Sequence, residues 1–155
     1  MSKNKLKELW NSNNYALNGW ISINNPFSAE IMSRQNYDTL TIDMQHGLID
    51  YSDLLGILQA ITGSGVMPIV RVPWLDPGYI MKALDTGAEG IICPMINNKK
   101  EAEQFVSFMK YPPLGNRSFG PTRQNIITGN NYYSNANDNV PVSYTHLTLP
   151  TNREV

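Results

Sequence analysis

The stretch Thr39-Leu-Thr-Ile-Asp-Met-Gln-His-Gly47 changes character halfway along its length. Its first four residues are β-branched or apolar, as in a buried strand, and polar side chains then arrive at Asp43, Gln45 and His46. Parallel sheets of α/β proteins carry their active sites at the carboxyl ends of the strands. The stretch therefore predicts a strand that ends in a functional site.

A second run of the same kind follows at residues 67–72, Met-Pro-Ile-Val-Arg-Val. It is almost continuously apolar, as expected of a parallel strand that is covered on both faces, and Arg71 lies near its end. The carboxyl ends of neighbouring parallel strands meet at one edge of a sheet. We therefore expect His46 and Arg71 to face a shared pocket that suits an anion.

Strand-like and helix-like segments alternate along the first 110 residues. The predicted strands are 16–23, 39–44, 67–72 and 90–95. The predicted helices are 26–34, 53–61 (capped by Ser52), 77–86 (capped by Asp76) and 99–109 (capped by Asn97 or Asn98), and residues 3–12 form a short helix or an entry arm. Successive βα units predict a parallel sheet with right-handed crossovers. Four such units form either half of a (β/α)₈ barrel or a small open sheet, and the pattern alone does not choose between them.

The sequence becomes irregular beyond residue 111. Residues 112–121 are rich in turn formers and predict a loop that carries Arg117. Such a loop either touches substrate or a neighbouring subunit or is a plain surface loop, and we expect the surface loop. Residues 125–139 are dense in Asn, Gly and Tyr and show little apolar periodicity, which predicts an extended loop or lid. Residues 139–142, Asn-Val-Pro-Val, look like the start of a fifth strand.

Composition describes an ordinary globular chain. Its 155 residues suffice for one domain with a core, 41% of them are hydrophobic and the net charge is −1. The absence of a basic excess argues against nucleic-acid binding, and no run approaches the ~18 apolar residues of a membrane span. No apolar stretch follows the basic start, so we see no signal peptide. The single cysteine, Cys93, fits a reducing compartment, and we expect a cytoplasmic protein.

Several motifs, in this order and at this spacing, resemble the HpcH/HpaI aldolase family from about residue 19 to about residue 120. The motifs are Tyr37-Asp-Thr-Leu-Thr-Ile-Asp-Met-Gln-His-Gly47, Pro68-Ile-Val-Arg-Val-Pro-Trp74, Ala83-Leu-Asp-Thr-Gly87, Cys93-Pro-Met95 and Tyr111-Pro-Pro-Leu-Gly-Asn-Arg-Ser-Phe-Gly120. Members of this family are class II, metal-dependent aldolases built as (β/α)₈ TIM barrels. The resemblance therefore implies the N-terminal half of such a barrel, with about four βα units and an irregular C-terminal tail.

The resemblance also implies roles for individual residues. His46 matches the family's acid/base histidine, Arg71 its substrate-binding arginine and Asp85 the aspartate that pairs with the histidine. Asp43 and Gln45 are possible supporting residues, and Gln45 stands where the family often has Glu. From the residues alone, His46 is as readily a structural histidine, Arg71 a partner of Asp43, and Asp85 the end of a helix. Asp43 would order a metal-bound water, hold Arg71 or only cap the following turn.

The metal ligands of the family, a Glu and an Asp on the fifth and sixth strands, have no matching position in this sequence. Residues 143–155 instead resemble the translation of a transposon-end sequencing adapter. We therefore expect a partial aldolase domain over residues 1–142 and a non-native tail over residues 143–155, in which His146 has no function. A complete parent would bind Mg²⁺ or Mn²⁺, whereas this fragment would not.

The implied activity is that of a lyase, an aldolase that cleaves 4-hydroxy-2-oxo acids to pyruvate and an aldehyde. Its partners would be a small-molecule oxo acid and, in the parent, further copies of itself. A second hypothesis is that the chain as it stands is a non-catalytic half barrel, prone to associate through its uncovered faces. A third is a related lyase that acts on acyl-CoA thioesters.

Overall fold

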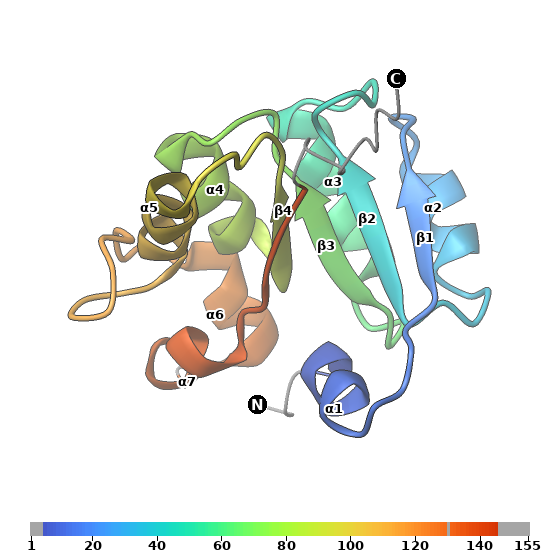
Figure 1. Ribbon diagram of the computed structural model, residues 1–155. Coiled ribbons are helices and arrows are strands. Elements are labelled where there is room, and N and C mark those ends of the chain that lie inside the picture. The colour runs from blue at the N-terminus through green and yellow to red at the C-terminus, as the bar shows by residue number, and fades with distance from the viewer. Residues whose placement is uncertain (1–4, 130, 146–155) are drawn as a thin grey trace, which may run out of the picture.

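The computed structural model describes residues 5–129 and 131–145 and contains a five-stranded parallel sheet (Figure 1). The strands are β1 (Asn18–Ile21), β2 (Thr39–Asp43), β3 (Met67–Arg71), β4 (Gly90–Cys93) and β5 (Val142–Tyr144). The helices are α1 (Lys5–Asn11), α2 (Pro26–Met32), α3 (Tyr51–Ile61), α4 (Pro77–Thr86), α5 (Lys99–Met109), α6 (Thr122–Thr128) and α7 (Tyr132–Asn139).

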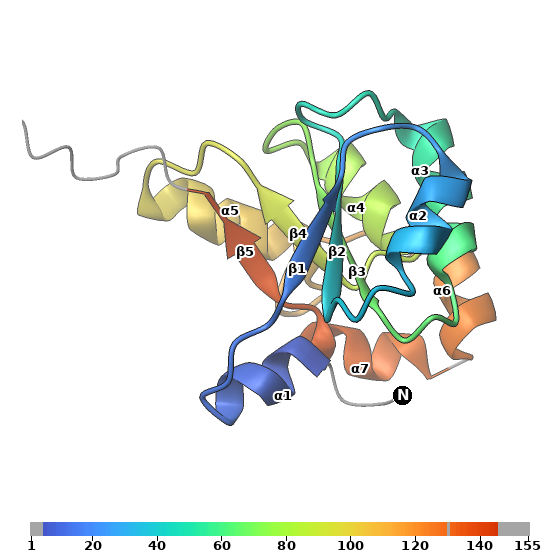
Figure 2. The same ribbon diagram turned by 90° about the vertical axis from the view of Figure 1, so that its right-hand side faces the viewer.

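The sheet is the N-terminal half of a (β/α)₈ barrel. Its strands follow one another in chain order, β1-β2-β3-β4-β5, and every pair is parallel. Helices α2 to α5 lie on one side of the curved sheet, as the two views show (Figures 1 and 2). A doubly wound open sheet reverses its strand order and carries helices on both faces. The strand order and the one-sided helices therefore decide between the two alternatives that the sequence left open.

The main core lies between the outer face of this sheet and its helices. It is built from the fully buried side chains Leu40, Ile42, Val70, Leu54, Ile57, Leu58, Ile80, Leu84 and Phe105. All five residues of β2 are buried, which accounts for its apolar beginning. No helix among the described residues is both long and apolar enough to cross a membrane.

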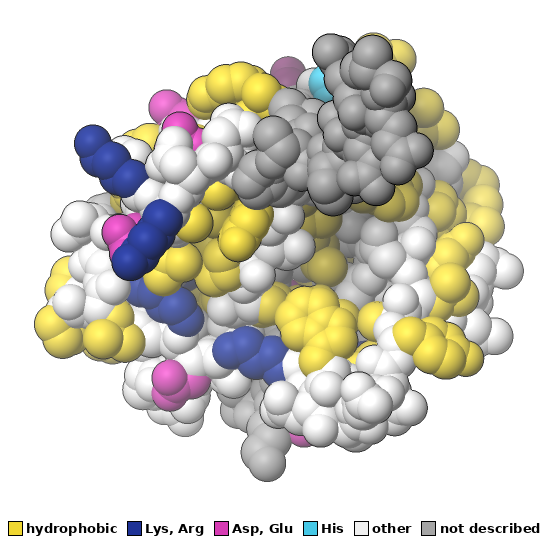
Figure 3. Space-filling view, viewed as in Figure 1, with side chains coloured by type: hydrophobic (Ala, Val, Ile, Leu, Met, Phe, Trp, Pro, Cys, Tyr) yellow, Lys and Arg dark blue, Asp and Glu magenta, His cyan; other side chains and the backbone are white. Residues whose placement is uncertain are grey.

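The inner face of the sheet is covered at its lower end by α1. Leu6 of α1 packs with Met67 and Ile69 of β3, and a pocket of about 180 Å³ lies beside them, with Trp10 and Ile92 in its lining. Apolar side chains gather on this face of the molecule (Figure 3). Helix α1 thus closes the amino end of the half barrel, opposite the end where a barrel enzyme carries its active site.

Local capping explains where the helices begin. Asp50, not Ser52, caps α3: its Oδ1 accepts the N–H groups of Ser52 (2.7 Å) and Asp53 (3.1 Å), while Asp53 Oδ2 accepts the Asp50 N–H (2.8 Å). The prediction of Ser52 was wrong because this reciprocal capping box starts the helix two residues earlier. Asp76 caps α4 and Gly87 ends it, as predicted, and Asn98 caps α5.

The predicted loop at residues 125–139 is wrong, since residues 125–128 lie in α6 and residues 132–139 form α7. Long-range polar contacts hold α6 in place. The Arg123 guanidinium donates to the Thr86 carbonyl (2.6 Å) at the end of α4, and to the Leu58 carbonyl (3.3 Å) and Thr62 Oγ1 (2.7 Å) at the end of α3. Gln124 is buried and donates to the Ala88 carbonyl (3.1 Å). Polar contacts of this kind do not require apolar residues at helical spacing, so the sequence gives no periodic signal for these helices.

The fifth strand begins at Val142, the last residue of the predicted start at 139–142, because Asn139 still belongs to α7. It pairs with β4 through Val142, Ser143 and Tyr144. The paired region thus extends two residues into the segment predicted to be a non-native tail. The rest of that segment, with His146, lies outside the described residues, and the boundary between domain and tail stays a prediction.

Candidate active site

The carboxyl ends of β2 and β3 bring Asp43 and Arg71 side by side. The two residues are direct partners in the strand register. Arg71 Nε donates to Asp43 Oδ1 (2.8 Å), and Arg71 Nη2 donates to Asp43 Oδ2 (2.6 Å). The Asp43 side chain is 4% exposed and that of Arg71 is 18% exposed. This two-pronged ion pair fixes the plane of the guanidinium at the strand ends.

Asp43 also shapes the turn that carries the next two residues. Its Oδ1 accepts the backbone N–H groups of Gln45 (3.0 Å) and His46 (3.3 Å). Burial acts to raise the pKa of Asp43, but the hydrogen bonds from Arg71 and from the two N–H groups outweigh it and lower that pKa. Asp43 is therefore ionised near neutral pH. It both holds Arg71 and caps the turn, two of the alternatives considered for it.

Trp20 of β1 is the second side chain that contacts the Arg71 guanidinium. The Arg71 Cζ atom lies 4.6 Å from the centre of the Trp20 ring, within the range of a cation–π contact. Trp20 is 44% exposed, so it borders solvent on its other side. Among the described residues Arg71 Nη1 has no hydrogen-bond partner. The guanidinium is thus oriented by two neighbours and keeps donors for a ligand.

His46 lies in the exposed loop between β2 and α3. Its imidazole is held by no side chain in the described part of the chain, while its backbone N–H is bound to Asp43. Gln45 is partly buried, and its Oε1 is a buried acceptor without a partner there. The imidazole is free to contact a ligand or another protein surface above the strand ends.

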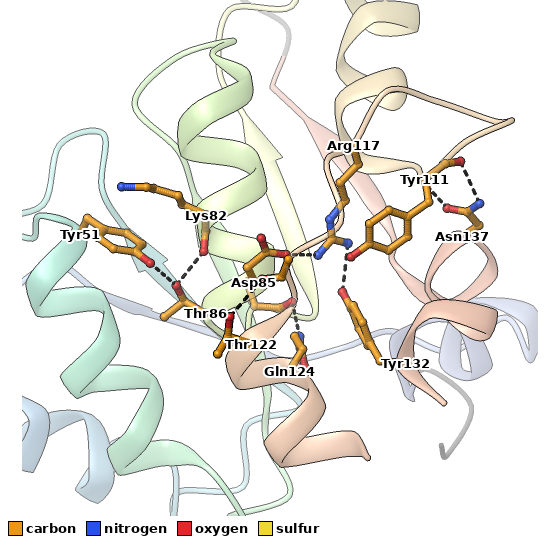
Figure 4. Close-up of polar contacts among 12 residues, drawn as sticks. Tyr51, Lys82, Asp85, Thr86, Tyr111, Arg117, Thr122, Gln124, Tyr132 and Asn137 are labelled. Carbon is orange, nitrogen blue, oxygen red and sulfur yellow. Dashed lines mark hydrogen bonds and ion pairs between the residues drawn. The ribbon is translucent and has the colours of Figure 1, made fainter. Parts of the chain in front are cut away.

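Asp85 does not join this group within the chain. It is the penultimate residue of α4, which runs for ten residues from the carboxyl to the amino edge of the sheet, about 15 Å. Its carboxylate pairs with Arg117, Nη2 to Oδ1 at 2.7 Å (Figure 4). The expected pairing of Asp85 with His46 in one chain is therefore not met, because α4 carries Asp85 toward the opposite edge.

Arg117 also departs from expectation. Its side chain is fully buried rather than part of a surface loop. The rings of Tyr111 and Tyr132 flank its guanidinium. The residue lies in a stretch of turn formers, and nothing local in that stretch signals burial. The ion pair with Asp85 spans 32 positions of sequence, so only the folded chain reveals it.

The described residues do not form a metal centre. Between residues 5–129 and 131–145, no group of three or more His, Cys, Asp or Glu side chains is placed to hold a metal ion. Both oxygens of Asp43 are already bound by Arg71. The side chains at this edge suit an anion better than a cation.

Gly47 permits the turn that presents His46. A Cβ atom at this position would lie 2.2 Å from the Asp43 carbonyl oxygen, closer than atoms can approach. We expect Gly47→Ala to displace the turn and to lower stability by about 1–3 kcal/mol, as overpacking does. Urea unfolding of the 155-residue chain measures the loss, with Gly120→Ala, whose added Cβ would lie 3.8 Å from the nearest atom outside its chain neighbours, as a control for added methyl bulk. Equal stability of Gly47→Ala and the unmutated chain would contradict the tight turn.

Comparison with known proteins assigns the fold and site to a family. A family model described as HpcH/HpaI aldolase/citrate lyase matches residues 17–145. The chain is 42% identical over 137 residues to a hydroxypyruvate/pyruvate aldolase of Rhizorhabdus wittichii, covering 88% of this chain and 55% of that protein. It is 37% identical over 126 residues to a 2-dehydro-3,6-dideoxy-6-sulfogluconate aldolase of Pseudomonas putida, covering 80% and 49%.

Solved structures agree. The crystal structure of an HpcH/HpaI aldolase/citrate lyase family protein from Burkholderia cenocepacia superposes with a TM-score of 0.84 at 29% identity, covering 91% of this chain and 58% of that one. The chain spans about half the length of the curated relatives that it matches. Since the family model covers most of its length, the chain belongs to the HpcH/HpaI aldolase/citrate lyase family.

Proposed function

We propose that the whole protein represented by this chain is a lyase that cleaves a 4-hydroxy-2-oxo acid to pyruvate and an aldehyde. The observation that carries the proposal is the Arg71–Asp43 pair, which presents an oriented guanidinium beside His46 at the carboxyl edge of a half barrel. Curated relatives named as aldolases support the reaction type.

We further propose a reducing, cytoplasmic location, because the only cysteine, Cys93, is buried and unpaired.

In this proposal Arg71 binds the carboxylate and oxo group of the substrate. His46 takes the proton of the C4 hydroxyl, the C3–C4 bond breaks, and the bonding electrons form the enolate of pyruvate while the aldehyde leaves. Protonation of C3 then gives pyruvate. Arg71 offsets the negative charge that grows on the enolate oxygen. Asp43 holds Arg71 in place and keeps it paired when no substrate is bound.

A divalent cation, Mg²⁺ or Mn²⁺, would stabilise the same enolate in the whole protein. The described residues do not supply its ligands. We propose that the ligands come from the part of the longer protein that matches the other half of its relatives. The chain of 155 residues alone is then expected to give no turnover.

A completed chimera tests the proposal. It joins residues 1–142 to the remaining C-terminal part of the Rhizorhabdus wittichii aldolase, which is 42% identical to this chain over 137 residues. We expect pyruvate release from a 4-hydroxy-2-oxo acid with added Mg²⁺ or Mn²⁺, measured by coupled NADH oxidation, and loss of release with a chelator. A folded chimera that shows no turnover, when the parent aldolase assayed in parallel is active, would contradict the proposal. Robust turnover by the 155-residue chain would contradict its dependence on the missing half.

Asp85 retains its proposed role only if it serves His46 of a second copy. Its side chain is 25% exposed, and a pocket of about 220 Å³ opens beside it, lined also by Tyr51, Leu55 and Lys82. The exposed His46 loop of another molecule would suit this pocket. Its imidazole would meet the Asp85 carboxylate, and its Leu48, which is 79% exposed, would pack against the apolar wall. We therefore propose that the whole protein acts as a homo-oligomer.

Mixing two inactive chimeras tests this arrangement. His46→Ala and Asp85→Ala are each expected to lose most activity. Co-refolding them should restore about one quarter of the unmutated activity, because half of the sites keep His46 and half of those face a chain that keeps Asp85. A mixture that stays inactive would place both residues in one chain, and full activity of Asp85→Ala alone would remove Asp85 from the reaction.

A further inference from the structure

Arg117 is a fully buried cation whose position is set by aromatic rings. Its side chain is 0% exposed. The guanidinium carbon lies 4.5 Å from the centre of the Tyr111 ring and 5.5 Å from that of Tyr132. Arg117 Nη1 also donates to the Tyr132 hydroxyl at 3.0 Å. The Tyr111 ring and the Tyr132 hydroxyl restrict how the guanidinium can turn.

The loop that carries Arg117 is anchored independently of Asp85. The Arg117 N–H donates to the Lys110 carbonyl (2.9 Å), and the Asn116 N–H donates to the Ser107 carbonyl (2.7 Å). A Cβ at Gly115 would lie 2.4 Å from the Ser107 carbonyl oxygen, so the loop folds tightly onto the end of α5. The guanidinium is therefore placed by the backbone and the rings, and the carboxylate is placed by the guanidinium.

Only one oxygen of Asp85 is engaged. Arg117 Nη2 donates to Oδ1 at 2.7 Å, and no described residue donates to Oδ2 (Figure 4). Burial raises the pKa of Asp85, and the charge and hydrogen bond of Arg117 work against that rise. The ion pair thus holds the carboxylate through one oxygen, on a side chain that is 25% exposed.

The cluster is costly as a purely structural device. Arg117 Nε and the Tyr111 hydroxyl are both buried, and neither has a hydrogen-bond partner among the described residues. Burying a charge, and leaving buried polar groups unsatisfied, costs stability. An apolar filling of the same volume would often be as stable or more stable. The cluster keeps the buried guanidinium of Arg117 despite its cost in stability, which points to a role for that charge.

We infer that Arg117 is a positioning residue that holds the Asp85 carboxylate in one orientation, with its free oxygen directed to a donor on a partner surface. The inference rests on the proposed role of Asp85 toward His46 of a second copy. Arg117 itself touches no reacting atom. It acts through Asp85, and Tyr111 and Tyr132 act through Arg117.

The 155-residue chain tests the positioning directly by NMR. In the unmutated chain we expect separate, slowly exchanging Nη proton signals for Arg117, because two rings and two hydrogen bonds oppose its rotation. Carboxyl signals report the titration of Asp85. Arg117→Gln should raise its midpoint by about 1–3 pH units, since an opposite charge is removed, whereas Arg117→Lys should raise it less. Asp38, paired with Lys5 at 3.0 Å, serves as the control carboxylate and should not move.

The outcomes separate the inference from the proposed function. Averaged Arg117 signals in the unmutated chain would overturn the inference even if Arg117→Gln fails to fold, and so would an unchanged Asp85 midpoint in a folded Arg117→Gln chain. In the completed chimera, Arg117→Gln should lower kcat with little change in KM and shift the pH profile, with partial rescue by Arg117→Lys. If Asp85→Ala leaves the chimera active, the proposed function of Asp85 is contradicted. The NMR result alone then decides whether Arg117 positions the carboxylate.

Discussion

His46→Gln in the completed chimera is expected to lower kcat by about 10²–10⁴-fold, the contribution typical of one positioned acid/base group. Gln keeps a hydrogen-bonding side chain but moves no proton. KM should change little, because Arg71, held by Asp43 and Trp20, still binds the oxo acid. Steady-state rates of pyruvate release over a range of substrate concentrations separate the two constants.

The control for this prediction is Tyr15→Gln, which changes an exposed side chain just before β1, at the amino edge of the sheet. It should leave kcat unchanged. A His46→Gln chimera with unchanged kcat would assign the proton transfer to another group.

Asp43→Ala is expected to have the largest effect on folding stability. It leaves the Arg71 guanidinium, 18% exposed, without its counter-charge and removes the acceptor that caps the turn at Gln45 and His46. Removing one partner of a buried pair costs about 3–5 kcal/mol, and we expect about 3 kcal/mol because Arg71 keeps some contact with solvent. Urea unfolding of the 155-residue chain measures it.

The exposed pair Lys5–Asp38 supplies the matched control. Its side chains are 48% and 27% exposed, so Asp38→Ala should cost no more than about 1 kcal/mol. Comparable losses for the two variants would show that the Asp43–Arg71 pair is not a buried anchor. The same comparison made in the chimera should show binding of the oxo acid weakened only by the change at Asp43.

The stability contributed by Asp43 should also depend on pH. The folded-state pKa of Asp43 is lowered from 3.8, so its contribution is fully present above the unfolded value and is lost as the pH falls through the lowered one. The gap in stability between the unmutated chain and Asp43→Asn should therefore be constant from about pH 5 to 7 and shrink below about pH 4. A gap that widens on acidification would contradict the assigned direction.

The sequence by itself determined the order of strands and helices through β4 and α5, and the chemistry at the ends of β2 and β3. Both follow from local rules. Apolar runs and capping residues mark where elements lie, as at Asp76 and Gly87, and parallel strands necessarily bring their carboxyl ends to one edge. For that reason Asp43, His46 and Arg71 could be placed together without coordinates. Residues 122–139 could not, because their helices depend on side chains such as Arg123 that bind distant helix ends.

Only the tertiary structure decided the curvature that makes the sheet half of a barrel, the burial of Arg117 and the partner of Asp85. Each depends on which residues far apart in the chain become neighbours. The Asp85–Arg117 pair joins a helix end to a loop 32 residues later, and no local period encodes such a contact. Local patterns predict which face of a strand or helix a side chain occupies. They do not predict which distant residue will contact that face, and the partner of Asp85 is such a residue.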